Sequence, residues 1–195
     1  RHGPLTPGYG SSGGQIGPEF GFGQVIGDAS KQQVLLIKAA WGGKSLAHNF
    51  QSPSIGKYPP PLQPDAPGYF YHQTLQLARE VTQNIEAFFP DYQGQGMEIA
   101  GLGWHQGWND QYGENDDVNY ERNLAAFIKD IRSAEHGLGI ANLPVVIATS
   151  GNIDKETPIK DGQRAMADTG KYPEFAGNVA VVDTDKPYGP DKMGF

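Results

Sequence analysis

Four short apolar runs, each followed by glycine or polar residues, limit most strongly how this chain can fold. They cover residues 33–40 (QVLLIKAA), 97–104 (MEIAGLGW), 143–149 (LPVVIAT) and 179–183 (VAVVD). Continuous aliphatic runs of this length are typical of strands that are covered on both faces. We therefore expect four buried strands.

Helical patterns separate these runs. One helix is expected to begin at 17–19, where proline takes the first helical position, and a long one is expected from about Gly68 to just before Pro90. Further helices are expected from Asp116 and over 158–171. Strands that alternate with helices at this spacing predict an α/β fold, a three-layer αβα sandwich with a mostly parallel central sheet.

The chain length suits a single domain. A chain of 195 residues can bury one core, so we expect residues 1–195 to form one domain of the flavodoxin-like type. The sequence has no initiator Met and ends one residue after Gly194. We expect the domain to be incomplete at both ends.

The charge of the chain excludes several classes of partner. The net charge is −7, and the 15 Lys and Arg residues are scattered, so we expect neither nucleic acid nor an anionic membrane as a partner. There is no apolar run of about 18 residues that would predict a membrane span. A small neutral or weakly charged substrate fits this composition better.

Several motifs match known sites only by their letters. Residues 10–14 match G-x-S-x-G but follow no strand, and 43–45 resemble the end of a phosphate loop but have Lys38 where that loop needs glycine. The oxygen-rich segment 109–117 lacks the register of a calcium loop, and we interpret it as a solvated loop and helix cap. No two histidines are spaced i, i+4, so neither a metal nor another cofactor is expected.

Polar and glycine residues gather where the expected strands end. The four runs lead into 40–43 (AWGG), 104–107 (WHQG), 149–152 (TSGN) and 183–185 (DTD). Parallel sheets bind their ligands beyond the carboxyl ends of the strands. We expect the functional site there.

Two of these strand ends resemble sequence blocks of the SGNH-type esterases, and most closely those of the sialate O-acetylesterase-like group and its acetylxylan esterase relatives. Residues 37–46 (IKAAWGGKSL) resemble a block with a Gly-Gly-Ser-Leu turn, and 103–110 (GWHQGWND) resemble a block with the pattern Trp-x-Gln-Gly-Glu-Ser-Asp. Residues 17–23 (GPEFGFG) resemble the segment that precedes the Gly-Gly strand in this group.

The resemblance implies hydrolysis of O-acetyl groups on carbohydrate by a Ser–His pair. The oxyanion hole would consist of the backbone N–H of the nucleophile, a backbone N–H of Gly43 or its neighbour Gly42, and the side-chain amide of Gln106. Fixed donors of this kind stabilise the charge that develops in the transition state of acyl transfer. From the residues alone, Gln106 is equally well interpreted as an amide that satisfies loop backbone at a strand end.

The catalytic Ser and His of the family have no match in this chain, and we expect both to fall outside the 195 residues. Asp183, Asp185 and Asp191 stay open as the acid that would orient the His. Trp108-Asn109 replaces the Glu-Ser of the family pattern, which leaves the substrate preference open.

Other residues at the strand ends are expected to line the site. Trp104 and Trp108 would wall it and stack on a sugar ring, with His105 and Ser150 beside them. Ser45 follows two glycines and is interpreted as the cap of a short helix over 46–50 rather than as a nucleophile.

The function expected from these observations is that of a carbohydrate O-acetylesterase acting on a small-molecule or polysaccharide acetyl ester. The alternative is a non-catalytic carbohydrate-binding or scaffold protein with the same fold. The family resemblance favours a secreted or periplasmic protein, and the sequence does not predict an oligomeric state.

Overall fold

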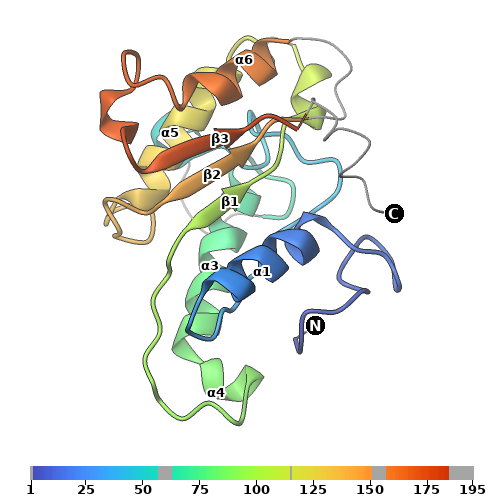
Figure 1. Cartoon of the computed structure of the whole chain (residues 1–195). Helices are drawn as coiled ribbons and strands as arrows, with labels where there is room; N and C mark the ends of the chain where they lie inside the picture. The colour runs from blue at the N-terminus through green and yellow to red at the C-terminus, as the bar shows by residue number, and fades with distance from the viewer. Residues whose placement is uncertain (1, 57–62, 115, 151–156, 185–195) are drawn as a thin grey trace, which may run out of the picture. The chain divides into compact units, whose positions relative to one another are not determined.

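A computed structural model describes residues 2–56, 63–114, 116–150 and 157–184, and it has the expected α/β fold with a parallel sheet (Figure 1). The chain divides into two compact units. The smaller consists of residues 1–40 and 76–97, and the larger consists of residues 41–75 and 98–195. Because each unit is compact by itself, the single domain stays a prediction.

The larger unit contains the sheet. Its elements are the strands β1 (Leu102–Trp104), β2 (Val145–Ala148) and β3 (Val179–Val182), the helices α2 (Pro53–Gly56), α5 (Tyr120–Arg132) and α6 (Pro158–Ala165), and the 3-10 turns η1 (Trp108–Gln111) and η2 (Pro173–Phe175). Helix α3 (Tyr69–Gln83) begins in this unit and ends in the smaller one, which also holds α1 (Pro18–Ala29) and α4 (Ile85–Phe88).

The three strands are parallel and lie in the order β1-β2-β3 (Figure 1). Trp104 lies opposite Ile147, which in turn lies opposite Val181. Because side chains alternate along a strand, these three residues share one face of the sheet. That face is the buried one, since Ile147 is 0% exposed, whereas its neighbour Val146 is 37% exposed.

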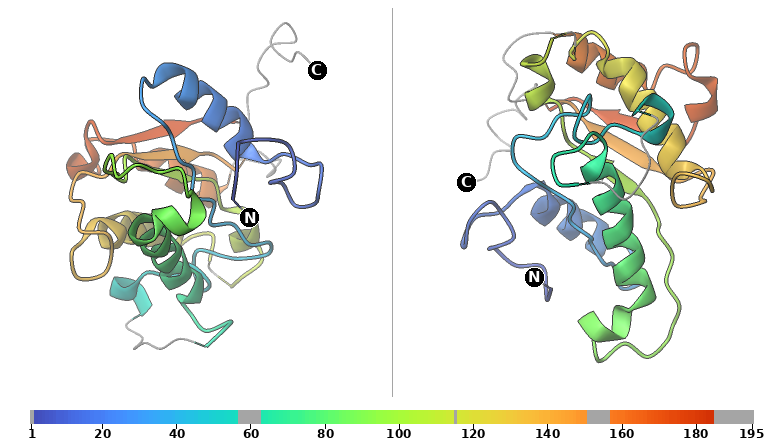
Figure 2. Two further views of the ribbon diagram at one scale, coloured as in Figure 1. Left: turned by 90° about the horizontal axis from the view of Figure 1, so that it is seen from below. Right: turned by 180° about the vertical axis from the view of Figure 1, so that it is seen from behind.

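Helix α5 supplies the apolar surface that covers the buried face, and α6 packs beside it (Figure 2). Leu124, Phe127, Ile128 and Ile131 occupy positions i, i+3, i+4 and i+7 and are all buried, as expected for one stripe of a helix. At the end of α5, the buried Arg132 donates hydrogen bonds to the backbone oxygens of Leu143 (2.6 Å) and Asn178 (3.2 Å). The end of the helix is thereby joined to the residues that precede β2 and β3.

Three of the four expected strands are confirmed, and the strand expected at 33–40 is wrong. No strand is described within residues 2–40 and 76–97, so the run 33–40 has no partner in its own unit with which to form a ladder. The run instead packs on α1, where a side chain at Gly23 would collide with Leu36. Lys38 pairs with Glu19 of α1 at 2.9 Å. Burial raises the pKa of Glu19, but the contact with Lys38 and the backbone hydrogen bonds together lower it below its usual value.

The expected helices are confirmed with changed ends. The long helix predicted from Gly68 is interrupted at Asn84, which separates α3 from α4. The helix predicted over 158–171 ends at Ala165. Within the described part of the chain, no helix combines the length and apolarity that a membrane crossing requires.

Adjacent positions on β2 test which face of the sheet carries the core. Ile147→Ala removes a fully buried side chain, and we expect it to lower the free energy of unfolding by about 2–5 kcal/mol. Val146→Ala, on the exposed face, should change it by about 0.5 kcal/mol or less. Urea unfolding measures both, and equal losses would contradict the assignment of the faces.

Candidate functional site

The carboxyl ends of β1 and β2 meet, as the parallel sheet predicts. Gln106 follows β1, and Ser150 follows β2. The hydroxyl of Ser150 donates to the backbone oxygen of Gln106 at 3.3 Å. Two of the polar strand ends identified in the sequence therefore belong to one cluster.

The side-chain amide of Gln106 joins this cluster to the segment that follows Gly42-Gly43. Its Nε2 donates to the backbone oxygen of Lys44 at 3.0 Å and to Oδ2 of Asp110 at 2.6 Å. Its Oε1 accepts from the hydroxyl of Tyr120 at 3.2 Å. A flipped amide would turn Oε1 toward two acceptors, so the orientation of the group is determined by its partners.

Asp110 lies at the centre of these contacts. Its side chain is 0% exposed, and besides Gln106 it accepts from the backbone N–H groups of Leu46 and Ala47, both at 2.9 Å. Burial raises the pKa of Asp110, and the nearby charge of Asp116 adds to this rise, while the three hydrogen bonds oppose it.

The sequence analysis missed Asp110, because it assigned residues 109–117 to a solvated loop. A signal was present, since Asp110 occupies the position of the Asp that ends the family pattern Trp-x-Gln-Gly-Glu-Ser-Asp. Neither composition nor spacing, however, shows that a carboxylate in a polar segment is fully buried.

The Gly42-Gly43 turn has the conformation for which its second glycine is needed. Gly43 has φ +66°, a left-handed conformation that residues with a side chain rarely adopt. A side chain at either glycine would meet no atom within 4 Å, so the requirement at Gly43 is conformational rather than steric.

Ser45 caps the segment that follows it, as predicted, but residues 46–50 form turns rather than the expected short helix. It is 5% exposed, and its hydroxyl oxygen accepts from the backbone N–H of His48 at 3.2 Å. Its own backbone N–H donates to the side-chain oxygen of Asn49 at 2.9 Å. The hydroxyl stabilises the turn after the two glycines.

A second amide, that of Gln163 in α6, holds the backbone at Gln106. Gln163 is fully buried, and its Nε2 contacts the backbone oxygen of Gln106 at 2.7 Å and Oγ of Ser150 at 3.0 Å. Its Oε1 accepts from the backbone N–H of Ser150 at 3.0 Å. A side chain at Gly107 would collide with Ser150 and Ile159 and press on Gln163, so glycine is needed here for close packing.

Tyr120, the first residue of α5, closes the network. Its one hydroxyl hydrogen lies between the backbone oxygen of Gln106 at 2.6 Å and Oε1 of Gln106 at 3.2 Å, and its oxygen accepts from Nε1 of Trp104 at 3.2 Å. Burial raises the pKa of Tyr120, which keeps the hydroxyl protonated and able to donate. The sequence analysis identified neither Tyr120 nor Gln163, since they lie in helices 14 and 57 residues after Gln106 and no local pattern links them to it.

Trp104 was expected to wall the site, and that expectation is wrong. The side chain is only 7% exposed and packs between Phe50 and Phe127, with ring centroids 5.4 and 4.4 Å away. Trp104 points to the buried face of the sheet, where a sugar cannot stack on it.

Trp108 and His105 do lie at the surface. Trp108 is 44% exposed, and its ring meets that of Tyr112 edge to face at a centroid distance of 5.9 Å. His105 is exposed on the strand end beside Gln106. Their part in binding substrate stays a prediction.

Ser150 and the acidic residues differ in how the structure places them. Ser150 is 2% exposed and belongs to the buried network rather than to an open wall.

Asp183 accepts from Arg164 at 3.2 Å and from the hydroxyl of Thr149 at 3.0 Å. Its role in orienting a His stays a prediction, and Asp185 and Asp191 lie outside the described residues.

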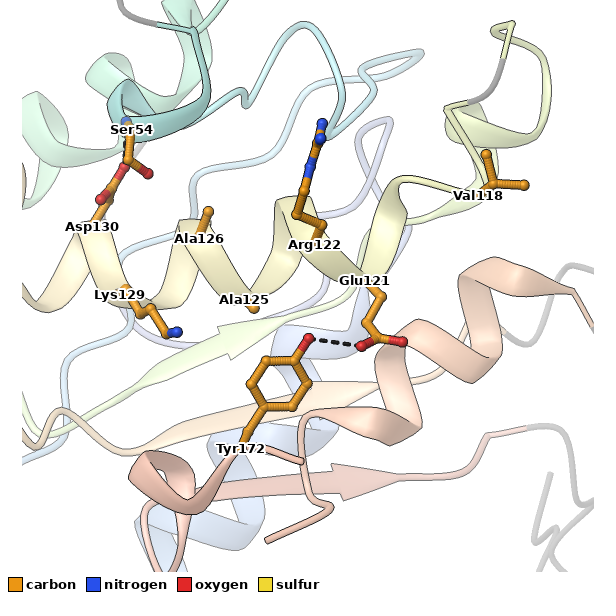
Figure 3. Close-up of a pocket in the computed structure, with 9 residues that line it drawn as sticks. All are labelled: Ser54, Val118, Glu121, Arg122, Ala125, Ala126, Lys129, Asp130 and Tyr172. Carbon is orange, nitrogen blue, oxygen red and sulfur yellow. Dashed lines mark hydrogen bonds between the residues drawn. The ribbon is translucent and has the colours of Figure 1, made fainter. Parts of the chain in front are cut away.

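A cavity of about 630 Å³ lies along the outer side of α5 (Figure 3). Within it, Glu121 accepts from the hydroxyl of Tyr172 at 2.7 Å, and it also accepts from Lys171 at 2.8 Å. These bonds outweigh partial burial and hold the pKa of Glu121 below its usual value. The lining includes neither of the two glycines nor Gln106, so this cavity is not the site predicted from the strand ends. Its lining residues are Ser54, Val118, Glu121, Arg122, Ala125, Ala126, Lys129, Asp130 and Tyr172.

The described residues contain no group of three or more His, Cys, Asp or Glu side chains placed to hold a metal ion. Asp110, the fully buried carboxylate of the site, is surrounded by N–H donors. These N–H groups stabilise the negatively charged carboxylate and would disfavour a cation beside it.

Comparison with known proteins supports the family resemblance and the fold. The family model described as carbohydrate esterase, sialic acid-specific acetylesterase, matches residues 4–193. The fold is similar to that of a protein from Arabidopsis thaliana solved by X-ray crystallography, with a TM-score of 0.60 and 20% sequence identity. The match covers 91% of this chain and 59% of the plant protein, so the chain spans less than two thirds of that relative. No curated protein matched the chain.

The hydroxyl of Tyr120 offers a direct test of the network. Tyr120→Phe leaves the buried groups of Trp104 and Gln106 without this partner, and we expect the free energy of unfolding to fall by about 1–3 kcal/mol. Tyr112→Phe serves as the control, because Tyr112 is 67% exposed. Chemical denaturation compares the two variants, and a parent-like Tyr120→Phe would show that the hydroxyl bonds do not stabilise the fold.

Proposed function

The chain belongs to the sialic acid-specific acetylesterase family of carbohydrate esterases, and on this premise we propose that it hydrolyses acetyl esters on sugars by a Ser–His mechanism. One observation carries the proposal. The amide of Gln106 contacts the backbone of Lys44, next to Gly43, so the two segments from which the oxyanion donors would come lie together.

The proposed reaction is an acyl transfer in two halves. A Ser hydroxyl attacks the acetyl carbonyl while a His accepts its proton, and the carbonyl oxygen becomes an oxyanion. Collapse of this intermediate breaks the bond to the sugar oxygen, which takes the proton from the His and leaves as a hydroxyl, while the acetyl group stays on the Ser. Water, activated by the His, then attacks this acetyl-enzyme and releases acetate. Neither the Ser nor the His role is assigned to a described residue.

The donors proposed for the oxyanion are the backbone N–H of Gly43 and one N–H of Gln106. The two N–H groups of Gln106 have unequal partners, since one bonds the carboxylate of Asp110 and the other bonds the neutral carbonyl of Lys44. Hydrogen bonds to charged acceptors are the stronger ones. The N–H toward Lys44 is therefore the one that an oxyanion can share.

Surface aromatics favour a sugar as the alcohol part of the ester. Trp108 and Tyr112 are both exposed and stand edge to face, so either ring can pack against the apolar face of a pyranose. The same observation supports the second candidate function, a protein that binds carbohydrate without hydrolysing it.

Removal of the Gln106 amide tests the proposed mechanism. In the full-length protein, Gln106→Ala should lower kcat for p-nitrophenyl acetate by about 10²- to 10³-fold, the usual effect of losing one oxyanion donor. Gln32→Ala is the control, because this glutamine is exposed in the smaller unit. The assay compares kcat and KM of parent and variants, with acetylated xylan and O-acetylated sialic acid as sugar substrates.

The outcomes separate the two candidate functions. An active parent with an unaffected Gln106→Ala variant would remove Gln106 from the oxyanion hole but leave the esterase in place. A parent that turns over none of the three esters would contradict the esterase. Calorimetric binding of the same sugars by that inactive parent would then support the carbohydrate-binding protein.

A further inference from the structure

We propose that Asp110 is a positioning residue, whose buried carboxylate holds the turn after Gly42-Gly43 and the amide of Gln106 in one fixed arrangement. The catalytic part of this inference rests on the proposed function. Asp110 itself need not touch the substrate, because it would act through the two groups that it binds.

The geometry requires both carboxylate oxygens. Oδ1 accepts from the N–H of Ala47, while Oδ2 accepts from the N–H of Leu46 and from Nε2 of Gln106. Because each oxygen accepts from at least one N–H donor, neither position can be taken by an amide nitrogen without placing two donors against each other. Asn is nearly the same size as Asp, but it would turn an NH₂ group toward one of these donors. Asp110→Asn therefore changes the polarity of the group with little change in its size.

The contacts close a ring between distant parts of the chain. Leu46 and Asp110 are 64 residues apart, yet the carboxylate bonds the amide of Leu46 while Gln106 bonds the carbonyl of Lys44. Ser45 lies between Lys44 and Leu46, and its hydroxyl oxygen accepts from the backbone N–H of His48. The backbone on the C-terminal side of Gly43 is thereby anchored at consecutive residues, which sets where the N–H of Gly43 lies relative to Gln106.

Among the residues that the structure describes, few ionisable groups act on Asp110. Asp116, from the loop before α5, is the charged neighbour that acts on it, and His48 in turn acts on Asp116. Tyr120 stays protonated beside it. A titration that is seen at Gln106 can be assigned to Asp110 when it disappears in Asp110→Asn and persists in Asp116→Asn.

The first test separates positioning from binding. In the full-length protein, Asp110→Asn should lower kcat for p-nitrophenyl acetate by about 10²-fold, comparable to the loss of one oxyanion donor, with KM nearly unchanged. Asp117→Asn is the matched control, because its side-chain oxygen accepts only from the N–H of Val118 among the described contacts and an amide can do the same. A folded Asp110→Asn with the parent's kcat would overturn the catalytic part of the inference.

The second test does not depend on catalysis. The side-chain NH₂ signals of Gln106, identified by their loss in Gln106→Ala, should shift with pH in the parent, with a midpoint above the ordinary Asp pKa of about 3.9. No titration of these signals in the parent would overturn the contact, even if Asp110→Asn does not fold. An inactive parent with a clear titration would refute the proposed esterase while it supports Asp110 as the group that orients Gln106.

Discussion

A carboxylate that is completely removed from water needs compensation, and at Asp110 three N–H groups provide it. An unpaired charge in this place would cost several kcal/mol, so the surrounding backbone must adopt the shape that delivers those donors. The loop after Gly43 and the turn η1 therefore depend on each other. Either one, folded alone, would leave buried polar groups without partners.

The rest of the site is built by the same requirement on uncharged groups. At the carboxyl ends of β1 and β2 the sheet ladder stops, and the backbone groups of Gln106 and Ser150 need new partners. Gln163 and Tyr120 supply them from two helices. The network thus connects α5, α6 and the strand ends, and it keeps the backbone of Gln106 in place while its side chain reaches toward Lys44.

Local sequence patterns were sufficient for much of this architecture. The runs that became β1, β2 and β3 and the proline-initiated helices are visible because burial selects apolar residues at fixed periods. Gly43 and Gln106 were predicted as site residues because each follows an apolar run and matches a sequence block of the family. The run 33–40 shows the limit of the method, since its composition is that of a strand but its unit has no described strand beside it. Pairing depends on a neighbour, which composition does not reveal.

The amino-acid sequence by itself determined the α/β class, the parallel direction of the strands, and the edge of the sheet at which polar groups meet. These properties follow from periodicity and chain direction, which are local. Only the tertiary structure decided that Trp104 faces the core, that Asp110 is buried, and that Gln163 reaches Gln106. Each of these facts is a contact between residues far apart in the chain, and the character of a polar side chain does not show which distant group will satisfy it.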